Sequence, residues 1–136
     1  MITVLIFTES RFPVDRKKLR EFVEQHLLHK LTGKVEVSIS IVGDRKMKFL
    51  NAKYRQINET TDVLSFPLAE SSAALDLSSG FSPDKSSPDK ILRLGDIIIS
   101  YPQAVLEAAE ENKLVIEQVQ FLIVHGLDHL LGIHHP

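Results

Sequence analysis

Four of the six histidines in this 136-residue chain lie in its last twelve positions, with spacings that suit a metal site. His125 and His129 are four residues apart in an apolar helical pattern. Their imidazoles therefore project from one face of a helix, roughly 5–6 Å apart at Cβ. Gly132 follows the last periodic residue and predicts a left-handed turn that ends the helix. We expect this turn to bring His135 back toward the other two imidazoles.

Three neutral imidazoles, with no cysteine in the chain, indicate a catalytic zinc site that keeps one coordination position open for water. We expect one Zn²⁺ per chain, although nickel or copper would also accept three imidazoles. The spacing is that of metzincin peptidases, but Gly126 stands where those enzymes carry a glutamate as general base. This difference argues against proteolysis. A helix-dipole preference for histidine, or a purification tag at the chain end, explains single histidines but not all the spacings together.

Charge is distributed unevenly along the chain. Residues 1–60 carry twelve Lys or Arg against seven Asp or Glu, whereas residues 61–136 carry four against eleven. The basic half could supply a phosphate-binding face, or its side chains could simply solvate a helix. The lack of cysteine excludes a disulfide framework, and the sequence has no signal peptide or long apolar run. We therefore expect a cytoplasmic protein with no membrane partner.

Hydrophobic periodicity predicts an α+β fold, a small mixed sheet packed with helices in a single domain over residues 1–136. The expected strands are 3–7, 35–42, 63–66 and 91–100, the last being central because it is the most apolar. The expected helices are 15–31, 45–56, 104–112 and 115–131. In the second helix, Met47, Leu50 and Tyr54 are expected to face inward. Residues 69–90 are rich in Ser, Pro and Asp and are expected to form a mobile surface insertion.

Three motifs together resemble those of the YbeY family of bacterial zinc-dependent endoribonucleases. They are Leu50-Asn51-x-x-Tyr54-Arg55 followed by Thr61-Asp62-Val63-Leu64-Ser65-Phe66-Pro67, then Leu94-Gly95-Asp96-Ile97, and the terminal His-Gly-Leu-Asp-His-Leu-Leu-Gly-Ile-His-His. They occur in the family's order within residues 45–136, while the first forty residues match only in outline. The resemblance implies a metal-hydrolase fold whose C-terminal helix carries the metal ligands.

The resemblance also implies an activity. It implies cleavage of single-stranded RNA in 3′-end maturation of small-subunit rRNA and in ribosome quality control, with an rRNA precursor and small-subunit components as partners. Zinc would be held by His125, His129 and His135, the first two belonging to the catalytic centre. Arg55 matches the family's functional arginine and would be a catalytic or phosphate-contacting residue, whereas its position alone favours a helix-surface charge.

Further residues are expected around this centre. Lys48 and Lys53 are expected to contact RNA beside the catalytic arginine. Asp96, Asp128 and His134 are expected to surround and orient the metal ligands. Asp128 stands where the family usually has an apolar residue, and His134 where it usually has aspartate. The surroundings of the last ligand should therefore differ from those in the family.

Two other functions remain open from the sequence. One is a metallopeptidase or another zinc hydrolase, which the histidine spacing supports and Gly126 opposes. The other is a non-catalytic ribosome-assembly factor whose zinc is structural, so that removing the metal would unfold it.

Overall fold

The computed structural model describes residues 1–68 and 91–133. The strands are β1 (Ile2–Thr8), β2 (Val35–Val42), β3 (Val63–Pro67) and β4 (Leu92–Ser100). The helices are α1 (Arg16–Leu28), α2 (Asp44–Arg55), α4 (Tyr101–Glu110) and α5 (Val115–Leu130). The expected insertion at 69–90 lies outside these residues, as do His134 and His135. None of the helices described is long and apolar enough to cross a membrane.

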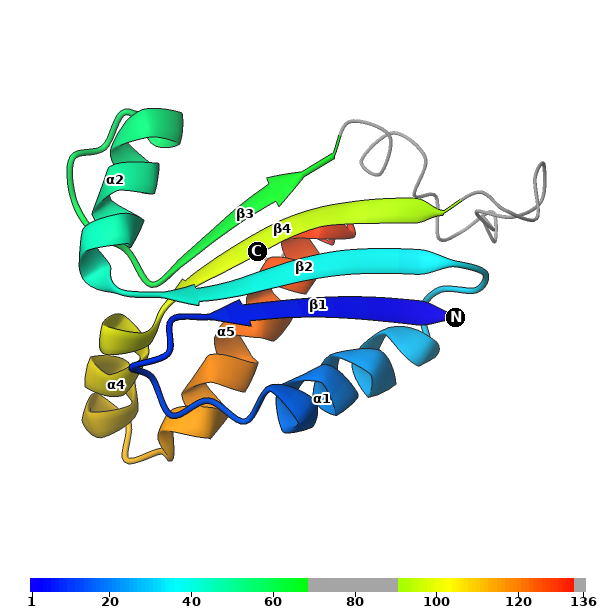
Figure 1. Ribbon diagram of the computed structural model, residues 1–136, viewed down its shortest axis with the longest axis horizontal. Coiled ribbons are helices and arrows are strands. Elements are labelled where there is room, and N and C mark those ends of the chain that lie inside the picture. The colour runs from blue at the N-terminus through cyan, green and yellow to red at the C-terminus, as the bar shows by residue number, and fades with distance from the viewer. Residues whose placement is uncertain (69–90, 134–136) are drawn as a thin grey trace.

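The strands form one mixed sheet in the order β1-β2-β4-β3. β1, β2 and β4 are parallel, and β3 pairs antiparallel with β4 at one edge. The most apolar strand, β4, has a neighbour on each side, as predicted. This arrangement of a mixed sheet and helices (Figure 1) confirms the expected α+β class.

One face of the sheet carries the main core. β2 alternates buried apolar residues with half-buried polar ones, as its period of two predicts. α1 packs against β1, and α5 runs behind the sheet in Figure 1 against β3 and β4. The helix residues in this core are Leu19, Val23 and Leu27 of α1 and Val119, Leu122, Ile123, Leu127 and Leu130 of α5. Each such side chain contributes about 1.5–3 kcal/mol on burial, so these two helices hold the sheet together.

Capping residues set the helix ends. Asp15 caps α1, its carboxylate accepting a hydrogen bond from the Lys18 N–H at 3.0 Å. α4 starts three residues earlier than expected, because the Ser100 hydroxyl accepts from the Gln103 N–H at 3.3 Å. Pro102 then falls within the first turn, where it needs no backbone partner.

The end of α5 has the turn that the glycine predicts. Gly132 has a φ of +76°, and its N–H donates to the His129 carbonyl at 3.1 Å. The Ile133 N–H donates to the Asp128 carbonyl at 2.8 Å. These two bonds are those of a Schellman motif, which reverses the chain directly after the second histidine of the candidate site.

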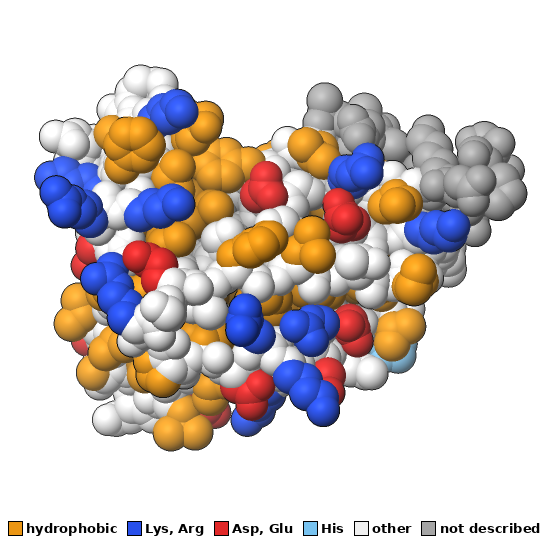
Figure 2. All heavy atoms as spheres, viewed as in Figure 1, with side chains coloured by type: hydrophobic (Ala, Val, Ile, Leu, Met, Phe, Trp, Pro, Cys, Tyr) orange, Lys and Arg blue, Asp and Glu red, His pale blue; other side chains and the backbone are white. Residues whose placement is uncertain are grey.

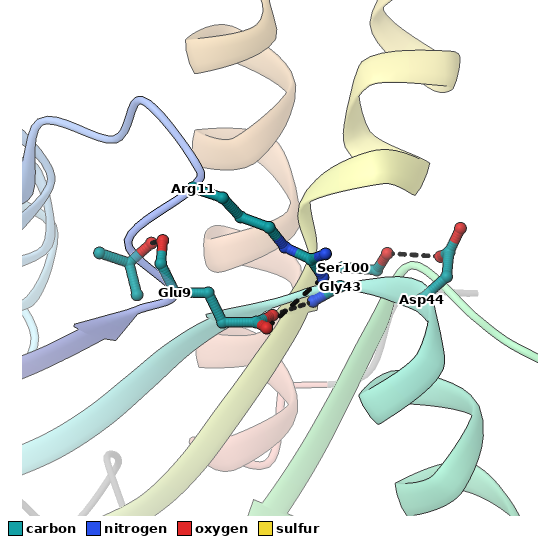
Figure 3. A network of polar contacts seen from close by, with 6 residues as sticks. Glu9, Arg11, Gly43, Asp44 and Ser100 are labelled. Carbon is teal, nitrogen blue, oxygen red and sulfur yellow. Dashed lines mark hydrogen bonds and ion pairs between the residues drawn. The ribbon is translucent and has the colours of Figure 1, made fainter.

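α2 is fixed at its first turn by a polar network (Figure 3). The Gly43 N–H donates to the Glu9 carboxylate, which ties the start of α2 to the end of β1. Asp44 Oδ1 accepts from the hydroxyl of Ser100 at 2.8 Å, as Figure 3 shows. It also accepts from the hydroxyl of Thr60 at 2.9 Å. Gln103 Nε2 donates to the same carboxylate at 3.2 Å. The network joins α2 to β4, α4 and the loop before β3.

The network also sets the protonation of Asp44. Burial raises the pKa of this carboxyl, but the hydrogen bonds from Ser100, Thr60 and Gln103 outweigh burial and hold the pKa below its ordinary value. The carboxylate therefore stabilises the fold above the unfolded-state pKa of about 4. This stabilisation is lost as the pH falls from there through the folded-state pKa.

We expect Asp44→Asn to lower the free energy of unfolding at pH 7 by about 1–3 kcal/mol, because charged hydrogen bonds are replaced by neutral ones. The difference from the unsubstituted protein should shrink as the pH falls through the lowered folded-state pKa, below which Asp44 is uncharged in both states. Urea unfolding at several pH values measures this. Asp15→Asn is the control, since asparagine caps a helix as well as aspartate. An equal difference at all pH values would contradict the assignment.

Candidate active-site cleft

A glycine lets α5 lie unusually close to the sheet. Gly126 is buried, and a Cβ built on it would lie 2.9 Å from Ile97 Cγ2 and 3.1 Å from Cδ1. Residue 126 therefore faces β4 and the core, not solvent. A glutamate at this position could not act as a general base without displacing the helix, so the structure gives a physical reason for the missing peptidase glutamate.

Beside the face that carries Gly126, α5 borders an open cleft of about 420 Å³. His125 and His129 line it from α5, while Tyr54 and Arg55 line it from the last turn of α2. β3 forms the wall between them through Val63, Leu64, Ser65 and Phe66. The structure thus brings together Arg55 and two of the three predicted ligands, from segments about seventy residues apart in the sequence.

The loop between α2 and β3 holds the two walls in place. Gln56 ends α2 in the left-handed conformation, with a φ of 59°. The Ile57 N–H donates to the Asn51 carbonyl at 3.3 Å, and the buried Asn51 side chain donates to the Glu59 carbonyl at 2.9 Å. These contacts turn the chain sharply after Arg55, so that the arginine stays beside the strand that follows it.

The two histidines fit part of a metal site. Both side chains are exposed and reach the same cleft from positions one helical turn apart, as the spacing predicts. Within residues 1–68 and 91–133, no three His, Cys, Asp or Glu side chains come close enough to hold an ion. His135 lies outside that part of the chain, so its place as third ligand stays a prediction.

Positive charge is concentrated on α2. Five of its twelve residues are basic against one acidic residue, Asp44. Figure 2 shows Lys and Arg side chains gathered over this helix, whereas acidic and basic side chains are mixed over the sheet and α1. Lys48 is exposed and lies two turns before Arg55, on the same side of the helix. Lys53 is also exposed, and its Nζ lies 5.2 Å from the centre of the Tyr54 ring. The basic surface therefore continues from the cleft along α2.

Two of the predicted surrounding residues point away from the cleft. Asp128 is turned toward α1: burial and Lys30 lower the pKa of His26 on that helix, and the charge of Asp128 offsets part of this lowering. Asp96 is exposed on β4, and its neighbour Ile97 faces α5. Because strand side chains alternate, Asp96 lies on the opposite face of the sheet.

The sequence did not identify two residues of the cleft. Tyr54 was expected to face inward, but 53% of its surface is exposed, and its ring packs edge-on against Phe66 at 5.2 Å. Ser65 was noted only as part of a motif. Pro67 was expected to stop the strand at residue 66 but lies within β3, where proline is typical of an edge strand.

Comparison with known proteins gives a consistent family relationship. Residues 5–136 match the family model described as endoribonuclease YbeY. An endoribonuclease YbeY of Dehalococcoides mccartyi is 43% identical over 102 residues, which are 74% of this chain and 61% of that protein. One of Bartonella quintana is 38% identical over 141 residues, covering 99% of this chain and 81% of that protein. The alignments to several relatives thus span only about three fifths of their length.

The fold also matches a solved structure. A solution structure of a Thermotoga maritima protein superposes with a TM-score of 0.64. The match covers 98% of this chain and 75% of the other at 24% sequence identity, so it supports the fold alone.

We expect Gly126→Ala to destabilise the protein. The added methyl overpacks the contact with Ile97, which costs about 1–3 kcal/mol. Alanine's helix preference offsets roughly 1 kcal/mol of this. Chemical denaturation measures the net change. Combination with Ile97→Ala should remove the penalty of the added methyl, so the two effects should not be additive. A more stable Gly126→Ala protein would contradict the close contact.

Proposed function

The chain belongs to the YbeY endoribonuclease family, and we propose that it hydrolyses single-stranded RNA in the cleft between α2, β3 and α5. The observation that carries this proposal is the meeting of Arg55 with His125 and His129 in one open cleft. The arginine fork suits a phosphate group, and the two imidazoles suit a metal ion. Together they form the parts needed for phosphodiester hydrolysis.

The metal in this proposal is one Zn²⁺ held by His125, His129 and His135. Zinc, when bound, supplies an activated water and polarises a phosphoryl oxygen. Arg55 lies on the wall formed by α2, and its guanidinium donates to the phosphate oxygens as negative charge develops on them. β3 forms the wall between them.

The cleft favours RNA over a peptide as substrate. No carboxylate lines it among the residues described, and residue 126 faces the core, so the usual general base of a zinc peptidase is missing. The basic surface of α2 instead suits a polyanion. Lys48 and Lys53 contact the RNA backbone as it leaves the cleft, and single strands fit because their phosphates and bases are both accessible.

The family relationship supports a more specific role. The substrate we propose is the precursor of small-subunit rRNA near its 3′ end, processed in the cytoplasm together with small-subunit components. His134, next to the proposed third ligand, helps to orient it.

His129→Ala should abolish both stoichiometric zinc binding and cleavage of single-stranded RNA, because the two imidazoles that remain are too few to hold the ion at the cleft. Metal analysis and a gel-based cleavage assay on an rRNA precursor measure the two effects. His29→Ala, at the exposed end of α1, is the control. Cleavage by the metal-free protein would refute the mechanism. Unfolding on chelation, with no RNA cleaved by the intact protein, would indicate a structural zinc in an assembly factor.

Arg55→Ala should lower kcat for RNA cleavage roughly 10²–10³-fold, as loss of one donor to a developing charge does elsewhere. Zinc content should stay unchanged, since the arginine is not a ligand. Arg55→Lys should recover part of the rate, because lysine keeps the charge but not the fork. Arg20→Ala, on the exposed side of α1, is the matched control. Turnover of peptides that survives Arg55→Ala would favour the peptidase alternative.

A further inference from the structure

β3 has one edge that faces the cleft, and its register determines which backbone groups point there. The Ser100 N–H donates to the Asp62 carbonyl at 2.9 Å, and the Leu68 N–H donates to the Leu94 carbonyl at 3.3 Å. In an antiparallel pair, residues alternate between bonding the partner strand and facing away from it. Even-numbered residues of β3 therefore bond to β4. Val63, Ser65 and Pro67 direct their backbone groups to the open edge.

Val63 and Ser65 both line the cleft, and each offers a donor and an acceptor at this edge. Ser65 is the one next to Phe66, whose ring contacts Tyr54. It lines the cleft together with Arg55 and both histidines, and β3 is the last strand of the sheet in the part of the chain described. Two residues later, Pro67 has no N–H to offer. This proline also opposes the pairing of a further complete strand along the edge. The exposed backbone thus suits a short planar group better than an added β-strand.

Tyr54 provides an aromatic surface at the same place. Its ring lines the cleft and is held by its edge contact with Phe66, yet half of it remains exposed. The Lys53 ammonium lies 5.2 Å from the ring centre, an exposed cation–π contact worth only about 0.5–1 kcal/mol. An incoming base can displace this ammonium from the ring, and the ammonium is then free to contact the adjacent phosphate.

We propose that the Ser65 backbone and the Tyr54 ring form a subsite for one unpaired base of the RNA substrate, next to the reacting phosphate. The inference rests on the proposed RNA-cleaving function and adds a reason for single-strand selectivity. The Watson–Crick edge of a base presents hydrogen-bond donors and acceptors side by side, and in a duplex this edge is used in pairing while the base is stacked between its neighbours. Only an unpaired, unstacked base can therefore offer that edge to the Ser65 N–H and carbonyl while it stacks on Tyr54.

The test measures whether the protein senses a single base. A fluorescent, hydrolysis-resistant 2′-O-methyl phosphorothioate oligomer is titrated with the zinc-loaded protein and followed by anisotropy. It is compared with oligomers that lack the base at one position in turn. One abasic position should weaken binding roughly ten-fold, as expected for loss of one base stacked on an aromatic ring. A blunt duplex of the same sequence should bind more weakly than the single strand.

Two substitutions connect this sensitivity to the subsite. Ser65→Pro removes the outward N–H without breaking a bond to β4, as Pro67 already does two residues on. Tyr54→Leu removes the stacking surface. Each should weaken binding of the intact oligomer and reduce the loss of affinity that removal of the base causes. Tyr54→Phe, which keeps the ring, should show the full loss of affinity again. Ser65→Ala removes the hydroxyl but keeps the backbone N–H, whereas Ser65→Pro removes both. A difference between these two variants therefore reports the N–H.

Matched controls lie elsewhere on the molecule. The Val35 N–H donates to the Met1 carbonyl and the Glu9 N–H to the Ile41 carbonyl, so even-numbered residues of β1 face away from β2. Thr8→Pro therefore places a proline, like that of Ser65→Pro, on the opposite edge of the sheet. Phe49→Leu removes an exposed aromatic ring of α2 that does not line the cleft. Both should keep the full penalty for the missing base.

The outcomes separate the two proposals. If the unsubstituted protein binds and cleaves single-stranded RNA but is indifferent to base removal at every position, the base subsite is wrong and the ribonuclease function stands. If it neither binds nor cleaves RNA, the function itself fails. Displacement of the oligomer by an uncharged extended peptide, with no base sensitivity, would assign the β3 edge to strand addition instead.

Discussion

The contact between Gly126 and Ile97 determines where the candidate site can be. Because residue 126 has no side chain, α5 packs closely against β4 and buries its apolar face in the main core. That contact also fixes the rotation of the helix about its own axis. His125 and His129, on the adjoining side of the helix, are consequently turned toward β3 and the cleft. A bulkier residue at position 126 would move the helix and with it both imidazoles.

The opposite wall depends on a different kind of interaction. α2 makes a smaller apolar contact with the sheet, through Met47 and Leu50 packing with Val42, Leu64 and Phe66. Hydrogen bonds to the Asp44 carboxylate supply much of its attachment to β4 and α4. The cleft therefore has one wall fixed by close apolar packing and another by a charged network. Positive charge is concentrated on the second wall, so the electrostatic attraction for a polyanion and the metal-binding side chains come from separate elements.

Much of the fold was predictable because it follows from local patterns. The alternation in β2, the helical stripe of Leu19, Val23 and Leu27, and the glycine after α5 each indicate their structure without knowledge of the rest of the chain. The expected start of α4 was three residues too late because the helical pattern does not reveal the Ser100 cap. Tyr54 was misassigned for a deeper reason. A helical stripe of apolar residues does not reveal where the sheet beneath it ends, and this ring contacts Phe66 of β3 while half of it stays exposed in the cleft.

By itself the sequence determined the identity and spacing of the chemical groups: two histidines one helical turn apart, an arginine at the end of a basic helix, and a proline directly after a short expected strand. These are local properties, set by side-chain type and helical or strand period. Only the tertiary structure decided that Arg55 and the histidines share a cleft, that Asp128 and Asp96 face elsewhere, and that the backbone of Ser65 is exposed beside them. Those relations depend on strand order, register and helix rotation, which arise from packing between residues distant in the chain.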